Sequence, residues 1–435
     1  MIAHPKARLS SGRRIAFGLL LGLGVLGAAQ AEDLLIRNAT VHTVAEQGTL
    51  SGADVWVRDG RIEGVGVGLS VPAGARVVEA DGKPLTPGLF AGLTGIGIEE
   101  VSAEPSGNDG ALAYPAPQLP QVRPEFDVAV AYNPRSTLLP IARRGGLTWT
   151  VLAPRSAPGG SIFAGLGGVV RLDGGSEVPY AERSALFINL GGAQSPLAGS
   201  SRAAQYMLIE QAIAEARNAV PIALPSNLLT LAGRTALVRQ FSGGRVVVSV
   251  DRAADIRRVL ALAARERFNL VLDGAAEGWL VADEIAAAGV PVLLDALANL
   301  PGSFDSLAAR LDNAARLHAA GVAVGFSQAG DASHNARKVR QLAGNAVANG
   351  LPWEAGLAGL TQVPADAFGL GDRLGSIEIG KRADLVLWSG DPLEVNTRAE
   401  RLWIDGNERP LTSRQTELRD RYLKPGHPLP RAYFR

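Results

Sequence analysis

The chain has 435 residues, with 43 lysines and arginines against 42 aspartates and glutamates, and it contains no cysteine. This nearly neutral balance argues against nucleic acid or an anionic membrane surface as the main partner. The lack of cysteine excludes disulfides, thiolate metal sites and thiol nucleophiles. A chain of this length is long enough for one large domain with a smaller domain beside it.

Residues 1–31 have the pattern of an export signal. Basic residues precede the apolar run Ile15–Ala29, and Ala29-Gln30-Ala31 provides the small-x-small pattern of a cleavage site. The run is shorter than the roughly 20 residues that span a bilayer. We therefore expect cleavage before Glu32, a periplasmic protein and no membrane span after cleavage. The pair Arg13-Arg14 leaves the export route, Sec or twin-arginine, open.

Residues 32–88 are predicted to form short strands. The apolar runs Ala53–Arg58 and Ile62–Val67 flank Asp59-Gly60, which is a two-residue hairpin signal. Pro87-Gly88 then predicts a sharp turn into the next strand. This segment is expected to be the first part of a small β domain.

Residues 89–370 alternate apolar strands with helical stretches. The predicted strands are Leu89–Ile98, Leu147–Ala153, Ala185–Leu190, Arg245–Val250, Asn269–Asp273, Val290–Asp295 and Val322–Gln328. The predicted helices are Ala254–Arg267, Gly278–Ala288, Ser306–Ala320 with Asp305 as its N-cap, and Asn335–Asn349. With an eighth strand expected between Gly192 and Phe241, this alternation predicts a (β/α)8 TIM-type barrel.

Two segments of the barrel region are predicted to be irregular. Ala103–Pro140 is rich in proline and polar residues, and we expect it to form a long loop over the barrel mouth. Pro158–Gly174 is predicted to be a glycine-rich excursion. Its Gly165–Gly168 stretch lacks the strand–loop–helix setting and the lysine of a phosphate-binding loop, so a turn is expected there.

Two motifs carry a family resemblance. LTPGLFAGLTG at 85–95 resembles the "PGLID-x-H-x-H" of the first barrel strand in the amidohydrolase superfamily, and GSIEIGKRADLVLWSGDPLE at 375–394 resembles its closing signature. The chain is similar to the imidazolonepropionase-like amidohydrolases, which are hydrolases acting on non-peptide C–N bonds. The resemblance implies a barrel at 89–370 and a composite β-sandwich that joins 32–88 to 371–435.

The same resemblance implies that this chain has other residues at the positions where the family has its metal ligands. The two histidines of the first strand fall on Leu93 and Gly95. In RVVVSVDRAADI, Ser249 and Asp251 stand in the places of two more histidines, and Arg252 matches the family. Two further positions complete the altered set: Asp273 in place of a histidine and Gln328 in place of the catalytic aspartate. Asp273, Asp251 and Gln328 are therefore the catalytic candidates, at degenerate positions.

The histidines of this chain are too few for the two-metal site of the family, which takes four. The sequence contains five, and only His334 is placed to reach the barrel mouth. Zinc-class ions need nitrogen, sulfur or carboxylate ligands in a fixed geometry, and without such an ion no hydroxide forms near neutral pH. We therefore expect no cofactor. Arg252, His334 and Asp331 are candidates for contacts at the mouth.

Two alternatives keep hydrolysis possible. Asp251, Asp273 and Asp295 all end predicted strands, and an acidic site made of them could hold Mg²⁺ or Ca²⁺, with Glu99, Glu100 and Asp331 nearby. Closely spaced carboxylates could also act as general acid and base without a metal. The interpretation that we favour is that these carboxylates cap helices or pair with Arg252 and Arg337.

The sequence thus predicts a metal-free pseudo-hydrolase that serves as a binding or partner subunit. Its partner would be a paralogous amidohydrolase or a second copy of the chain. The alternatives are an active amidohydrolase with a rebuilt carboxylate metal site, and a periplasmic binder of a small molecule. Substrate and oligomeric state do not follow from the sequence.

Overall fold

Two eight-stranded sheets organise the computed structural model, which describes residues 33–70, 73–113, 122–175, 180–217 and 227–423. The export signal predicted in residues 1–31 lies outside the described residues. Within the described ranges, none of the helices combines the length and the apolar character needed to cross a membrane.

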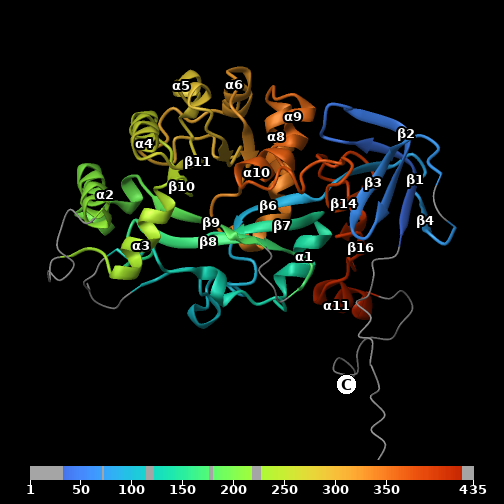
Figure 1. Cartoon of the computed structure of the whole chain (residues 1–435), viewed down its shortest axis with the longest axis horizontal. Helices are drawn as coiled ribbons and strands as arrows, with labels where there is room; N and C mark the ends of the chain where they lie inside the picture. Colours follow the sequence, from blue (N-terminus) through green and yellow to red (C-terminus); the bar gives the residue numbers. More distant parts are fainter. Residues whose placement is uncertain (1–32, 71–72, 114–121, 176–179, 218–226, 424–435) are drawn as a thin grey trace, which may run out of the picture. The chain divides into compact units, whose positions relative to one another are not determined.

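The first sheet is built from both ends of the chain. Its strand order is β16-β15-β14-β5-β1-β2-β3, and β4 pairs with β1. The strands are β1 (Leu34–His42), β2 (Thr49–Arg58), β3 (Arg61–Gly66), β4 (Arg76–Glu79), β5 (Pro84–Pro87), β14 (Leu385–Trp388), β15 (Ala399–Ile404) and β16 (Asn407–Glu408). Antiparallel pairing of β5 with β14 joins the two ends, drawn in blue and red in Figure 1. The predicted composite β domain is confirmed.

Two tight turns of this sheet contact each other. Asp59 and Gly60, which connect β2 to β3, have φ values of 48° and 76°, and Asp405 and Gly406 have 57° and 70°. Both pairs lie in the left-handed region that two-residue hairpins with these residues prefer. A Cβ on Gly60 would lie 2.8 Å from the carbonyl oxygen of Asp405, so the contact between the turns requires glycine there.

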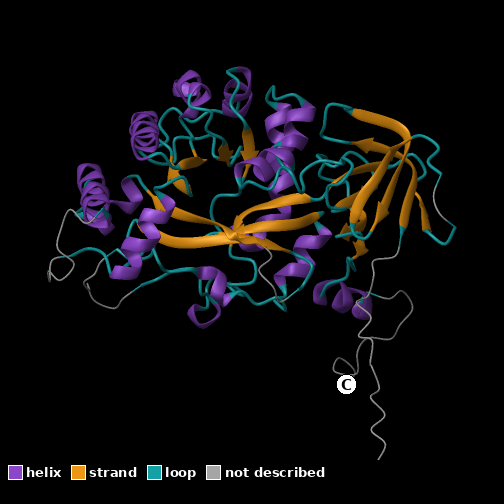
Figure 2. Ribbon diagram, viewed as in Figure 1, coloured by secondary structure: helices purple, strands orange, loops and turns teal. Residues whose placement is uncertain are grey.

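The second sheet forms a nearly closed barrel, which confirms the predicted TIM-type α/β fold. Its strand order is β13-β12-β11-β10-β9-β8-β7-β6. The strands are β6 (Leu89–Thr94), β7 (Leu147–Leu152), β8 (Phe163–Arg171), β9 (Tyr180–Asn189), β10 (Arg245–Val250), β11 (Asn269–Gly274), β12 (Val292–Leu294) and β13 (Val324–Phe326). Figure 2 shows helices around these strands, as expected for a sheet whose two faces are both covered.

The barrel sheet is not hydrogen-bonded into a ring between its first and last strands. No ladder joins the described residues of β6 and β13. Instead, the Phe90 N–H donates to the carbonyl of Leu360 over 2.8 Å, and the Leu93 N–H donates to the Ser327 hydroxyl over 3.0 Å. This seam between β6 and β13 opens onto the barrel mouth.

The prediction for the eighth strand was wrong in position and in direction. That strand is β8, which is antiparallel to both β7 and β9 and includes the Gly165–Gly168 stretch where a turn was expected. The described part of 192–241 holds η3 (Gly192–Ala198), α2 (Arg202–Ala216) and α3 (Leu231–Gln240). The glycines of β8 serve close packing: a Cβ on Gly167 would collide with the carbonyl of Leu152.

The remaining helices follow the predicted alternation, with one large difference. They are α1 (Leu138–Arg144), α4 (Ala253–Glu266), α5 (Ala282–Ala287), α6 (Asn313–Ala319), α7 (Ala332–Asn335), α8 (Val339–Ala348), α9 (Trp353–Ala358), α10 (Gln362–Ala367) and α11 (Arg414–Tyr422). The short 3-10 helices are η1 (Pro105–Gly107), η2 (Val128–Ala131), η4 (Gly278–Val281) and η5 (Ala336–Lys338). The helix predicted from Ser306 begins only at Asn313, and Asp305 does not cap it. Asp305 instead pairs with Arg202.

Candidate functional site

A cavity of about 600 Å³ lies at the carboxyl ends of the parallel barrel strands. Active sites of barrels of this kind occupy the same end, because the strand–helix loops meet there. The structure brings together all six altered ligand positions and one mouth candidate: Leu93, Gly95, Ser249, Asp251, Asp273, Gln328 and Asp331 line the cavity. The other two mouth candidates, Arg252 and His334, are not among its lining residues.

The first pair of altered positions offers no side chain that can bind a cation. Leu93 is buried and presents an apolar side chain. Gly95 has no side chain, and a Cβ there would lie 3.0 Å from Oε2 of Glu99 and 3.1 Å from the hydroxyl of Ser333. The space beside the first strand is therefore filled by a contact between Glu99 and Ser333, whose hydroxyl donates to Oε2 over 2.8 Å.

Asp273 lies at the end of β11 next to Ser249, which lies in β10. The Ser249 hydroxyl donates to Oδ2 of Asp273 over 2.6 Å. Burial raises the pKa of Asp273 to about 6, and the negative charges of Asp251 and Asp295 act in the same direction. The hydrogen bond from Ser249 opposes this rise because it stabilises the ionised carboxylate.

Two more aspartates follow the neighbouring strands. Asp251 accepts a hydrogen bond from the Ala276 N–H over 3.2 Å, and burial raises the pKa of its carboxyl group. Asp295 accepts from the N–H groups of Leu297 over 2.9 Å and Ala329 over 3.0 Å. These bonds to backbone N–H groups fit the predicted structural role of the carboxylates.

The predicted ion pairs with Arg252 and Arg337 are absent from the described structure. Arg252 instead holds Asp255 through two hydrogen bonds, of 2.9 and 3.0 Å. None of the three strand-end aspartates forms an ion pair with any residue that the structure describes. Their charges face the cavity without a neighbouring cation.

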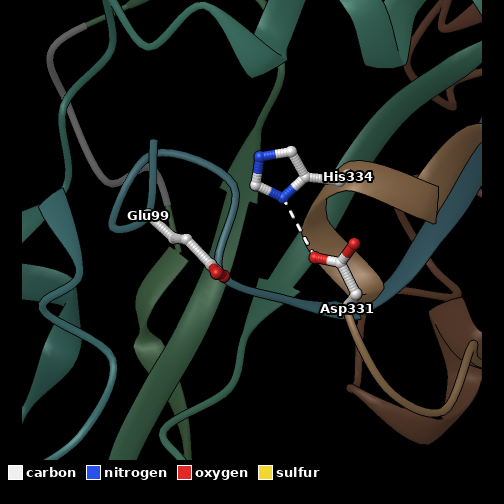
Figure 3. Close-up of side chains that lie close together, drawn as sticks. All are labelled: Glu99, Asp331 and His334. Atoms are coloured by element: carbon white, nitrogen blue, oxygen red, sulfur yellow. Dashed lines mark hydrogen bonds and ion pairs between the residues drawn. The ribbon is translucent and has the colours of Figure 1, made fainter. Parts of the chain in front are cut away.

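The three strand-end aspartates do not fit a chelated metal ion. Within the described ranges, one group of three side chains has ligand atoms that all lie within 4.8 Å of one another. It consists of Glu99, Asp331 and His334, and includes none of these aspartates. Figure 3 shows it, with Glu99 facing Asp331 and His334 from a separate loop. The expectation that no cofactor is held is therefore not confirmed, because this group offers one nitrogen and two carboxylate ligands.

Asn189, Asp305 and Arg155 are among the polar residues of the cavity that sequence reasoning missed. Asn189 ends β9 and donates to the Ser156 hydroxyl over 3.0 Å, so reading the last residue of every strand would have found it. Asp305 follows no strand, and nothing in the sequence indicates that it reaches the mouth. Charged lining residues are six carboxylates (Glu99, Asp251, Asp273, Asp295, Asp305 and Asp331) and one guanidinium, that of Arg155.

The described residues of the long loop predicted over the mouth do not reach the cavity. No described residue of Ala103–Pro140 lines the cavity. Bridges join Asp127 to Leu166 of β8 and Val122 to Leu229, so the described part of the segment runs beside the antiparallel strand.

Comparison with known proteins agrees with this architecture. A model of the Amidohydrolase family matches residues 252–411. The crystal structure of an amidohydrolase from Thermotoga maritima MSB8 superposes with a TM-score of 0.74 at 25% identity, over 86% of this chain and 99% of that one. Residues 252–411 thus match the Amidohydrolase family, and the chain shares the fold of this solved amidohydrolase. The positions that the sequence resemblance pairs with metal ligands carry Leu93, Gly95, Ser249, Asp251, Asp273 and Gln328.

Two further proteins are also similar to the chain. One is less similar in sequence and structure, and the other matches only a short part of the chain. Molinate hydrolase has a TM-score of 0.51 at 16% identity over 93% of this chain and 100% of its own, which shows the fold alone. Amidohydrolase tasK of Hapsidospora irregularis is 51% identical over 57 residues, which are 13% of this chain. The chain spans only 6% of the length of that curated relative.

Proposed function

We propose that this amidohydrolase-like protein binds a small organic cation in its barrel mouth and does not hydrolyse it at a strand-end metal centre. The observation that carries the proposal is the row formed by Asp251, Asp273 and Asp295. These residues follow three consecutive strands, face one cavity and have no cationic partner in the described structure.

The charge of the cavity favours a cationic ligand. Six carboxylates and one guanidinium line it, so the potential inside attracts positive charge and repels anions. Burial of the Asp251 and Asp273 carboxyl groups strengthens this effect, since a partly desolvated charge is screened less than one in water. The raised pKa of Asp273 reflects the cost of ionising a buried carboxyl group. A bound cation would stabilise the ionised form.

The size of the cavity and the spacing of its carboxylates favour an organic cation over a bare metal ion. About 600 Å³ lies within the range of sites for small organic molecules. The aspartate oxygens are too far apart to chelate one ion as a group of three. An amine, amidine or guanidine can span them, because its N–H donors are separated in space.

The side chains that would hold the metal for hydrolysis of the family type are absent from these positions. The strand-end positions that would hold the metal carry the apolar Leu93 and the side-chain-free Gly95, and the Ser249 hydroxyl is engaged with Asp273. Lowering the pKa of a bound water toward 7 is the contribution of such a metal. The residues at these strand ends do not fit that group.

One observation favours a second function. The pKa of Asp273 is raised to about 6, which suits a general base or acid near neutral pH. In that case Asp273 would take a proton from a water molecule in the cavity as the water attacks a carbonyl carbon. Turnover of amide or ureide substrates by the metal-free protein, and its loss in Asp273→Asn, would establish this alternative.

The proposal is tested by thermal-shift and calorimetric binding assays. The probes are amines, amidines and guanidines, each compared with a neutral amide and a carboxylate of the same shape, such as benzamidine with benzamide and benzoate. A cation at a hundred times its Kd should add about 2.7 kcal/mol to the free energy of unfolding. The carboxylate probes should add nothing.

Two variants decide whether the acidic row is responsible. Asp273→Asn and Asp295→Asn should each weaken cation binding about tenfold or more, since each removes a charge from the cavity. Asp372→Asn, on a side chain that is 71% exposed, is the matched control and should bind like the parent protein. Equal stabilisation by benzamidine and benzoate, or binding unchanged in both cavity variants, contradicts the proposal.

A further inference from the structure

We propose that Glu99, Asp331 and His334 form a site for one divalent ion of the zinc class at the rim of the barrel mouth. The three side chains offer ligand atoms within 4.8 Å of one another. None of them occupies a strand-end position at which the family holds its metal. The site is separate from the row of Asp251, Asp273 and Asp295, although Glu99 and Asp331 line the same cavity.

The contacts of His334 point to a cation between its ring and Asp331. Its Nε2 lies 3.2 Å from the carbonyl oxygen of Glu100, and a carbonyl can only accept, so Nε2 carries the ring proton. In the neutral ring Nδ1 then has a lone pair, and it faces Oδ1 of Asp331 at 3.1 Å. Two lone pairs at this distance require a positive species, either a second ring proton or a metal ion.

This arrangement of His334 matches that of histidines that bind metals. Such histidines generally donate their second N–H to a carbonyl or carboxylate, which orients the ring and makes the free nitrogen a better ligand. Ligands held about 2.0–2.2 Å from a zinc-class ion lie roughly 3.0–3.5 Å apart. The 3.1 Å between Nδ1 of His334 and Oδ1 of Asp331 lies in that range.

Glu99 supplies the second, independent observation. Its side chain is only 3% exposed, and Oε2 accepts the hydrogen bond from Ser333. Its other oxygen, Oε1, is buried and has no hydrogen-bond partner. The nearest cation, Nη2 of Arg155, lies 3.9 Å away and donates instead to Asn108. A buried carboxylate oxygen without a donor is unfavourable, and a bound ion would satisfy it.

The location gives the ion a structural consequence. Glu99 follows β6, whereas Asp331 and His334 follow β13, and these two strands share no ladder in the described sheet. Figure 3 shows Glu99 on one segment facing Asp331 and His334 on another. An ion bound there would link the first barrel strand to the last one. Because Glu99 and Asp331 also line the cavity, a fourth ligand of the ion would come from the cavity side.

The ligand set selects the class of ion. An imidazole nitrogen with two carboxylates suits Zn²⁺ and its transition-metal neighbours, whereas Ca²⁺ and Mg²⁺ prefer all-oxygen sites. Exposed acidic groups such as Asp331 gather by chance on many surfaces. The imidazole and the buried Glu99 distinguish this group from such a cluster.

The test measures zinc binding by the full chain, purified with a tag that contains no histidine and dialysed against a chelator. After incubation with Zn²⁺ and removal of the excess, elemental analysis should find about one equivalent per chain. Glu99→Gln and His334→Gln should weaken zinc binding about a hundredfold or more, since each removes a ligand. His318→Gln alters an exposed histidine of α6 and should leave binding unchanged.

Three outcomes overturn the inference. Zinc uptake below one tenth of an equivalent would mean an imidazolium–carboxylate pair only. Unchanged affinity in both Glu99→Gln and His334→Gln would mean adventitious binding. Mg²⁺ or Ca²⁺ binding as tightly as Zn²⁺ would refute the class of ion. If Glu99→Gln lowers the melting temperature of the metal-free protein too far, Asp331→Asn provides the same test on an exposed side chain.

Discussion

The hydroxyl of Ser249 donates a 2.6 Å hydrogen bond to Oδ2 of Asp273 across two neighbouring barrel strands. The parallel register of β10 and β11 places these residues opposite each other. In the resemblance to the family both stand where metal-binding histidines would be. Here the serine hydroxyl donates and the aspartate carboxylate accepts, so the two side chains are hydrogen-bonded to each other. Their polar contact does not depend on a metal ion.

Removing this hydroxyl should raise the pKa of Asp273 further. The hydrogen bond stabilises the ionised carboxylate, so Ser249→Ala moves the pKa above about 6. The measurement is an NMR titration of the carboxyl carbons of labelled aspartates, with Asp273→Asn to assign the signal. Ser306→Ala alters another lining hydroxyl of the cavity and should leave that titration in place. A fall in the pKa of Asp273 would contradict the assigned role of Ser249.

The contribution of Asp273 to the stability of the protein should fall as the pH rises from about 4 to about 6. The pKa of Asp273 is raised from 3.8 to about 6 in the folded state. In this window the folded protein holds a proton that the unfolded chain has released, so each increase in pH favours unfolding. Above the folded pKa, the ionised Asp273 lowers the free energy of unfolding by on the order of 2–3 kcal/mol.

The variant Asp273→Asn should remove this part of the pH dependence. Urea unfolding at several pH values between 4 and 8 measures it, and the variant should gain relative to the parent protein as the pH rises. A second carboxyl group, that of Asp384, also has its pKa raised to about 6 by burial, so a residual slope of the same sign should remain. A larger advantage of the variant at pH 4 than at pH 8 would show that the sign is wrong.

Two adjacent glycines of β8 should respond very differently to alanine. A Cβ on Gly167 would collide with the carbonyl of Leu152 and meet Phe187 at 3.0 Å, whereas a Cβ on Gly168 has nothing within 4 Å. Gly167→Ala should therefore destabilise the protein by about 1–3 kcal/mol or more. Gly168→Ala is the matched control, expected within about 0.5 kcal/mol of the parent. Urea unfolding compares the two, and equal effects would contradict the antiparallel packing of β8 on β7.

The ion pair between Arg202 and Asp305 should anchor the segment before α6 to α2. Arg202 is 29% exposed and Asp305 12%, and Asp305 also accepts from the Gly192 N–H. Arg202→Ala should lower the free energy of unfolding by about 1–3 kcal/mol, because it leaves a buried carboxylate with less compensation. A double-mutant cycle with Asp305→Asn should give a coupling of about 0.5–3 kcal/mol.

An exposed ion pair provides the comparison for this cycle. Arg257 and Glu284 pair at the surface, with side chains 53% and 46% exposed. Because water screens such pairs, Arg257→Ala should change the free energy of unfolding much less than Arg202→Ala does. A coupling at Arg202–Asp305 no larger than that at Arg257–Glu284 would show that Asp305 does not hold its segment in place.

The sequence by itself determined which chemical groups are present at the strand ends. Parallel barrel strands bring their carboxyl ends to one edge, so a residue that ends such a strand can be assigned to the mouth from its place in the strand alone. This is why Leu93, Gly95, Ser249, Asp251, Asp273 and Gln328 could be predicted to lie at the mouth, and all six line the cavity there. Turn pairs such as Asp59-Gly60 were also predictable, because their φ preference is a local property of the residues.

Only the tertiary structure decided which distant residues are neighbours. Glu99 and Ser333 are separated by 234 positions and meet at 2.8 Å because the first and last barrel strands lie side by side. The direction of β8 and the pairing of Asp305 with Arg202 are further results of packing between segments. Hydrophobic period and turn chemistry act over a few residues, whereas these contacts depend on how the whole sheet closes, which no local pattern encodes.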